Sequence, residues 1–311
     1  MEVKVENLRR SFGKLIAVDN LSFSFNSGDI CGFVGPNGSG KTTTINIMAA
    51  IDSPDSGDVL YDGISAVDYP EKISRIIGYM PDHLPAIKSI TVWEYLDFFG
   101  RCYGLKADAR SKRISYLEEF TGLGSMRNKQ LHSLSKGMKQ RVCLARALIH
   151  NPEIMIMDEP AAGLDPQARI ELRGMIKTLA AEGKGIFLSS HILSDLDEIC
   201  DSAVIIEKGR LLSFGPVSQM AEKQSNTAKF EVKFSGSPET IIAVVSGAEG
   251  VASVKQTATN TIIIETSVTN GDFAATMLQK LIGAGCKVTS FNQLETSLED
   301  IFMSITTGEV Q

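Results

Sequence analysis

The residues best suited to chemistry begin with a glycine-rich segment that follows an apolar run. Residues 35–42 read GPNGSGKT, and the apolar run Ile30–Val34 precedes them. The pattern GxxxxGK[ST] between a strand and a helix is typical of a phosphate-binding loop, because glycines let backbone N–H groups curl around phosphate oxygens. The helix N-terminus adds partial positive charge. The predicted phosphate-binding residues are Gly35, Pro36, Asn37, Gly38, Ser39, Gly40, Lys41, Thr42 and Thr43.

Two side chains of this segment have distinct expected roles. Lys41 is expected to hold the β- and γ-phosphates, and the hydroxyl of Thr42 is expected to bind the Mg²⁺ that bridges them. The alternative is a glycine-rich turn that matches by chance, and the strand before it and the helix after it argue against that alternative. The expected cofactors are therefore ATP and Mg²⁺.

A pair of acids supplies the second element that phosphoryl transfer needs. Residues 154–159 read IMIMDE, an apolar strand that ends in two carboxylates. Asp158 is expected to hold Mg²⁺ through its water shell, and Glu159 to polarise the water that attacks the γ-phosphate. The alternative is two acids that simply end a strand. Together with the phosphate loop, the pair predicts ATP hydrolysis.

The elements that must position these residues alternate between strands and helices. Short apolar runs predict strands at residues 3–5, 21–25, 30–34, 154–157, 186–189, 204–207 and 211–214. Residues 70–150 have mostly helical periodicity, clearest at 92–103 and 110–120, and a further helix is predicted over 167–181. This alternation predicts an α/β core with a helical subdomain at about 83–150.

A second, smaller domain is predicted after a polar stretch at residues 216–228. Beyond it the order is strand 230–234, helix 238–245, strand 251–256, strand 261–266, helix 272–282 and strand 287–292. That order is the α+β, ferredoxin-like arrangement. A last helix is predicted over 297–305, with Ser297 as N-cap and Asp300 completing an approximate capping box. The predicted domains are therefore 1–215 and 229–311.

Composition sets limits on the class of protein. The chain has 311 residues, which favours two domains, and 43% hydrophobic with 22% charged residues is typical of a globular protein. A net charge of −6 argues against a nucleic-acid partner. The five cysteines form no CxxC pair, as in a protein with reduced thiols. No run of about 18 apolar residues occurs, so we expect no membrane span.

A resemblance to a family rests on residues 134–141, which read LSKGMKQR and lie shortly before the acidic strand. In order and spacing, residues 1 to about 215 resemble the P-loop cassette of ATP-binding cassette (ABC) proteins. The resemblance implies that Ser135 and Gly137 face the nucleotide of a second cassette. From the residues alone, Ser135 is better explained as a structural helix cap, and the neighbouring motifs are what favour the nucleotide contact. The family pattern usually has glycine where Lys136 stands and glutamine where Met138 stands.

Further positions match the family one at a time. Asp165, in the segment AGLDP, matches the loop that joins the two cassettes, and His191, in LSSH, matches the switch histidine that supports the attacking water. Phe12 occupies the adenine-stacking position, with core packing as the alternative. Asp82 stands where the family usually has a glutamine, so it is either a ligand of Mg²⁺ or water, or a surface loop acid.

The resemblance also implies a role for the whole chain. It implies a cytoplasmic ATPase subunit, peripheral to the membrane, that powers export through a separate transmembrane permease. The second cassette would be an identical or a related chain, and the tail from Lys229, with SLEDIF at 297–302, resembles the C-terminal domain of many exporter ATPases. The alternative is an ABC ATPase that acts on the ribosome or DNA. Such proteins usually carry two cassettes, a coiled-coil insertion or zinc-binding cysteines, and the sequence has none of these.

Overall fold

The structure, a computed structural model, describes residues 1–83, 89–224, 228–266, 272–294 and 297–306. The chain forms two compact units, one containing Met1–Val217 and the other Ser218–Ser304. Each unit has its own cluster of buried apolar side chains. None of the helices within the described ranges is long and apolar enough to span a membrane.

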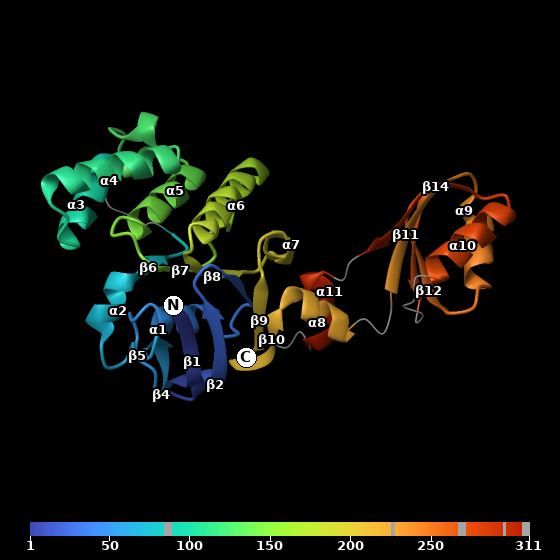
Figure 1. The fold of residues 1–311 in the computed structure, drawn as a ribbon, viewed down its shortest axis with the longest axis horizontal. Coiled ribbons are helices and arrows are strands. Elements are labelled where there is room, and N and C mark those ends of the chain that lie inside the picture. The colour runs from blue at the N-terminus through green and yellow to red at the C-terminus, as the bar shows by residue number, and fades with distance from the viewer. Residues whose placement is uncertain (84–88, 225–227, 267–271, 295–296, 307–311) are drawn as a thin grey trace. The chain divides into compact units, whose positions relative to one another are not determined.

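A six-stranded sheet forms the centre of the first unit (Figure 1). The strand order is β10-β9-β3-β8-β7-β6, and every neighbouring pair is parallel except β9 and β10. The sequences of β3, β7 and β8 are buried along their whole lengths, as expected for parallel strands that are covered on both faces. The strands are β3 (Ile30–Val34), β6 (Ile77–Met80), β7 (Ile154–Met157), β8 (Gly185–Ser190), β9 (Ser202–Glu207) and β10 (Arg210–Pro216).

A second, antiparallel sheet has the order β2-β1-β4-β5. Its strands are β1 (Glu2–Phe12), β2 (Leu15–Asn26), β4 (Ser56–Tyr61) and β5 (Ile64–Ser65). The prediction placed strands only at 3–5 and 21–25, and it missed β4 and β5. Both are short, and only the end of β4 alternates between exposed and buried residues, so their pattern is weak.

Some helices of the first unit lie beside the central sheet, and others form a group at one side of it, which corresponds to the predicted helical subdomain (Figure 1). The subdomain contains α3, α4 and α5, and a capping box between Thr91 and Glu94 begins α3. Two short 3₁₀ turns, 124–126 and 131–133, lie between α4 and α5. The helices are α1 (Lys41–Met48), α2 (Pro70–Ile76), α3 (Val92–Cys102), α4 (Ala107–Phe120), α5 (Lys136–Ala147), α6 (Pro166–Ala181) and α7 (Leu193–Asp197).

The second unit has an antiparallel sheet in the order β12-β13-β11-β14. With two helices between the strands, this is the predicted ferredoxin-like order. The last helix has the predicted cap, since the Asp300 N–H donates to the Ser297 hydroxyl at 3.1 Å and the Ser297 N–H donates to the Asp300 carboxylate at 3.2 Å. The elements are α8 (Val217–Gln224), β11 (Ala228–Ser235), α9 (Pro238–Ser246), β12 (Val251–Ala258), β13 (Thr261–Thr266), α10 (Asp272–Gly283), β14 (Lys287–Leu294) and α11 (Leu298–Ile305).

The stretch predicted as a linker, residues 216–228, is not wholly irregular. It contains the short helix α8, and residues 225–227 lie outside the described part of the chain.

Candidate nucleotide site

The phosphate loop joins the end of β3 to the start of α1, as predicted. Gly38 and Gly40 have φ values of +81° and +101°, which residues other than glycine rarely adopt. A Cβ atom on Gly40 would lie 2.2 Å from the carbonyl oxygen of Ala17, and one on Gly35 would lie 2.6 Å from that of Ile206. The loop therefore requires glycine at Gly35 and Gly40 for space within its own chain.

Lys41 lies inside this loop with only 7% of its surface exposed. Its ammonium group donates to the carbonyl oxygens of Gly35 at 2.7 Å and Pro36 at 3.1 Å. Burial lowers the pKa of Lys41, and the nearby charges of Glu159 and Asp158 oppose that shift. A buried ammonium that bonds only neutral carbonyls is well placed to bind anionic phosphate oxygens.

The two predicted metal ligands lie together. Asp158 follows β7, and burial raises the pKa of its carboxyl group, while hydrogen bonds from Ser189 and Thr42 lower it. The charges of Asp82 and Glu159 raise the pKa further. Thr42 and Asp158 thus form a hydroxyl–carboxylate pair of the oxygen ligands that Mg²⁺ prefers.

The predicted base and the switch histidine are in direct contact. Nδ1 of His191 lies 2.5 Å from Oε2 of Glu159, and the backbone N–H of His191 donates to the same oxygen at 3.3 Å. They meet because β7 and β8 are parallel neighbours whose carboxyl ends lie side by side. Glu159 has φ +47°, an uncommon value for a residue with a side chain, and such strain is often found at functional sites.

Ser189 is a member of this site that the sequence did not single out. Its buried hydroxyl donates to Asp158 Oδ1 at 2.7 Å and accepts the Glu159 backbone N–H at 2.9 Å. One hydroxyl therefore holds both acids. The only signal in the sequence was a pair of hydroxyl residues, Ser189 and Ser190, at the end of an otherwise apolar strand.

Asp82 lies at the edge of the same site. Its charge contributes to the raised pKa of Asp158, which places its carboxylate near that of Asp158. Its carboxylate also contacts Nδ1 of the His83 ring, while its backbone carbonyl accepts a hydrogen bond from Gln140 Nε2 at 2.8 Å. Asp82 is thus linked both to the acid pair and to α5, the helix that follows Ser135.

Ser135 and Asp165 cap helices. The Ser135 hydroxyl accepts the Met138 N–H at 3.3 Å at the start of α5, and Asp165 Oδ1 accepts the Ala168 N–H at 2.9 Å at the start of α6. A Cβ atom on Gly137 would meet nothing closer than 3.5 Å. Within this chain, Ser135 and Asp165 therefore act as helix caps, and Gly137 has ordinary space around it.

Phe12 is exposed rather than packed in the core. It ends β1 with 51% of its surface accessible, and the guanidinium of Arg10 lies 4.9 Å from the centre of its ring. The core-packing alternative is therefore wrong, and about half of the side chain is accessible to a planar ligand.

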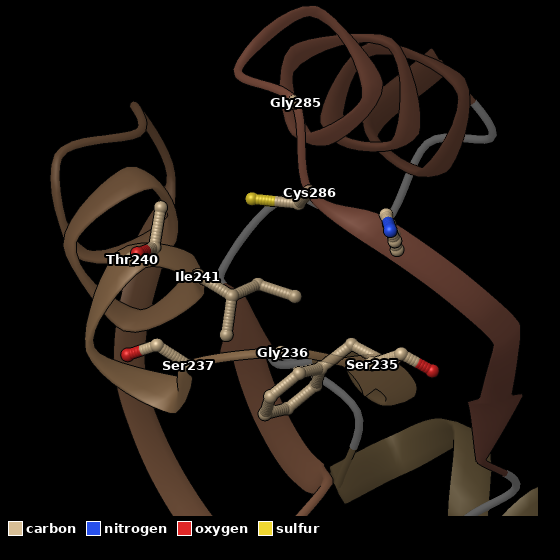
Figure 2. A pocket seen from close by; sticks show the side chains of 9 residues that line it. Ser235, Gly236, Ser237, Thr240, Ile241, Gly285 and Cys286 are labelled. Atoms are coloured by element: carbon tan, nitrogen blue, oxygen red, sulfur yellow. The ribbon is translucent and has the colours of Figure 1, made fainter.

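A separate pocket of about 310 Å³ lies in the second unit (Figure 2). Ser237 and Thr240 at the start of α9, Ile241, and Cys286 before β14 surround it. The predicted site residues all belong to the first unit, so the pocket is distinct from the candidate nucleotide site.

Comparisons with known proteins identify the family of this chain. The model of the ABC transporter family matches residues 18–162, and that of the ATP-binding protein DrrA1-3-like, C-terminal domain, matches residues 215–306. The uncharacterized ABC transporter ATP-binding protein YxlF of Bacillus subtilis is 31% identical over 304 residues, 97% of this chain and 99% of that protein. The linearmycin resistance ATP-binding protein LnrL of the same organism is 28% identical, with 98% of each chain covered.

A relative from another organism and two solved structures are also similar. The Nod factor export ATP-binding protein I of Ralstonia nicotianae is 37% identical over 213 residues, 68% of this chain and 66% of that protein. The structure of an ATP-binding subunit of an ABC transporter has a TM-score of 0.66 and 30% identity, with 72% of this chain and 93% of that chain covered. A cassette solved as a post-hydrolysis dimer bound to ADP and Pi has a TM-score of 0.64 and 26% identity, covering 69% and 98%. The chain therefore belongs to the ATP-hydrolysing, ATP-binding proteins of ABC transporters.

Proposed function

We propose that this chain is the ATPase subunit of an exporter, that it uses ATP with Mg²⁺, and that it drives a separate transmembrane permease. The observation that carries the proposal is the contact between Glu159 and His191 beside Asp158, because it joins a base, its supporting histidine and a metal ligand at one sheet edge. The names of two relatives, one for Nod factor export and one for linearmycin resistance, support the direction of transport.

The residues around the phosphates divide the chemistry among them. Lys41 binds the β- and γ-phosphates, and Thr42 with Asp158 holds Mg²⁺, which supplies charge neutralisation when bound. Glu159 orients the attacking water and accepts its proton, while His191 keeps the Glu159 carboxylate in place. Asp82 affects the charge at Asp158 and would be a further carboxylate available to the metal or its water.

A second cassette completes each site in this proposal. The start of α5 offers backbone N–H groups around Gly137, where nothing in the same chain crowds the glycine. Ser135 and Gly137 would then face the γ-phosphate bound by the partner cassette, with Asp165 organising the interface between the two. The similar cassette that was solved as a dimer supports this pairing.

The helical subdomain offers a surface for the permease. Phe98 on α3 is 55% exposed, and Tyr103 and Tyr116 follow on the same subdomain with 40% and 42% exposed. Exposed aromatic side chains are enriched where proteins contact partners. We place the permease contact on this subdomain and the chain on the cytoplasmic face of the membrane, with residues 1–215 as the cassette and residues 229–311 as an additional domain.

A capture experiment tests this function. Tagged Glu159→Gln protein, with ATP and Mg²⁺, is used to isolate partners from detergent-solubilised membranes of the source cells, and mass spectrometry identifies them. The matched control carries Lys41→Ala as well, so that it cannot hold ATP. We expect a polytopic membrane protein that is retained only without the second substitution. Ribosomal or DNA-bound partners, with no membrane protein, would contradict the proposal.

A further inference from the structure

One arginine links the segment of Asp165 to the segment that follows His191. Arg169, on the first turn of α6, donates from Nε to the backbone carbonyl of Leu164 at 3.1 Å. On its other side, Nη1 of the same guanidinium lies 4.0 Å from Oδ2 of Asp195, in α7. A single planar side chain therefore spans the loop before α6 and the helix after the switch histidine.

Asp195 is a buried carboxylate with one oxygen satisfied. Its side chain is 9% exposed, and Oδ1 accepts a hydrogen bond from Nη1 of Arg173 at 3.0 Å. Within the described ranges, Oδ2 is buried and has no hydrogen-bond partner. A buried carboxylate oxygen without a hydrogen bond is costly in free energy, and at 4.0 Å the Arg169 guanidinium is too far away to donate one.

The two arginines are not equivalent. Arg173 lies one turn further along α6, where it pairs with Asp195 and with Glu198, each at 3.0 Å, and so holds α7. Arg169 alone of the two also bonds the loop carbonyl at Leu164. A small movement of that loop would therefore shift Arg169 relative to Asp195 and leave the Arg173 contact in place.

We propose that Arg169 is a positioning residue that closes onto Asp195 Oδ2 when the loop at 162–166 moves, and that this contact carries the movement to His191. The inference rests on the proposed function, in which a partner cassette meets that loop. The guanidinium fork is suited to the task, because its five N–H donors can serve a carbonyl and a carboxylate at once. His191 lies four residues before Asp195 and contacts Glu159, so closure would complete the arrangement around the attacking water.

A double-mutant cycle on the full chain tests the contact. The variants are Arg169→Met, which keeps the apolar stem of the side chain, Asp195→Asn, and both together, each assayed for steady-state hydrolysis of MgATP. We expect Arg169→Met to lower kcat about ten-fold, equal to 1.4 kcal/mol, with the KM for ATP unchanged. The double variant should lose no more activity than the more impaired single variant.

Arg173→Met is the matched control on the same helix and the same carboxylate. It removes the anchor of α7, so we expect a lower melting temperature, whereas Arg169→Met should melt close to the unmodified chain. If the losses of kcat in the two single variants add in the double variant, or if KM changes at constant kcat, the inference is wrong. The proposed function would still stand in that case, provided that the unmodified chain hydrolyses ATP. An unmodified chain that does not hydrolyse ATP would overturn both.

Discussion

Replacement of Ser189 by alanine tests whether one hydroxyl holds both acids of the site. The side chain is fully buried, and its hydroxyl makes one hydrogen bond to a carboxylate and one to a backbone N–H. Alanine removes both bonds and leaves the Glu159 N–H without that partner. Loss of a bond to a charged group costs about 1.5–3 kcal/mol and loss of a neutral one about 1 kcal/mol, so we expect roughly 2.5–4 kcal/mol of lost stability.

Two assays on Ser189→Ala give separate readings. Thermal unfolding without nucleotide should show a melting temperature lower by roughly 5–16 °C, the shift expected for such a loss in a unit of this size. Steady-state hydrolysis should need a higher pH, because the hydrogen bond from Ser189 lowers the pKa of Asp158, and its removal raises that pKa further. The acid limb of the pH–rate profile should therefore move toward higher pH.

A matched control is Ser74→Ala, since Ser74 is exposed and bonds only the Glu71 carbonyl of its own helix. We expect its stability to change by less than about 0.5 kcal/mol and its pH profile to stay in place. If Ser189→Ala melts like the Ser74 variant and has the same acid limb as the unmodified chain, then the hydroxyl does not hold the acid pair.

Further expectations concern four other positions. Gly40→Ala should fail to give a stable cassette in thermal unfolding, because its Cβ would lie 2.2 Å from a carbonyl oxygen, whereas Gly137→Ala should melt normally and lose ATP turnover. Phe12→Ala should keep its melting temperature but raise the KM for ATP, since the ring is exposed. Burial raises the pKa of the Asp158 carboxyl group, so the folded chain binds the proton of this group more tightly than the unfolded chain does. The stability of the chain therefore falls as the pH rises through the raised pKa. Asp158→Asn without nucleotide should thus melt higher than the unmodified chain at neutral pH, and the difference should shrink in acid.

Local sequence pattern predicted the strands that carry the site because they are buried on both faces. Ile30–Val34 and Ile154–Met157 read as unbroken apolar runs, and the structure gives both strands the same bounds. The antiparallel sheet was harder to predict. Its strand β4 begins with Ser56 and Gly57, and Gly57 has φ +82° against the backbone of Asn7, so the contact that requires it lies far away in the chain. Such pairing leaves little trace in local periodicity.

Contacts between the chemical groups depended on strand order, which no local pattern encodes. Glu159 and His191 are 32 residues apart and meet because β7 pairs with β8, with Met157 opposite Leu188. The motif order suggested that both residues act on one phosphate. Their direct contact, and the hydroxyl of Ser189 between the two acids, required the register of the sheet.

The glycines of the site fall into two classes, and the difference bears on how the site works. Gly35 and Gly40 are required by their own chain, because backbone carbonyls stand where a Cβ atom would be. At Gly137 the nearest atoms would lie 3.5 and 3.8 Å from a Cβ atom, which is ordinary contact, and the residue sits in a helix that alanine would favour. Packing within the described chain therefore does not require a glycine at position 137, and a close approach that does require it would come from another molecule. Under the proposed function, a second cassette that brings a phosphate to the start of α5 would be such a molecule, and the site on one chain would then be half of a working site.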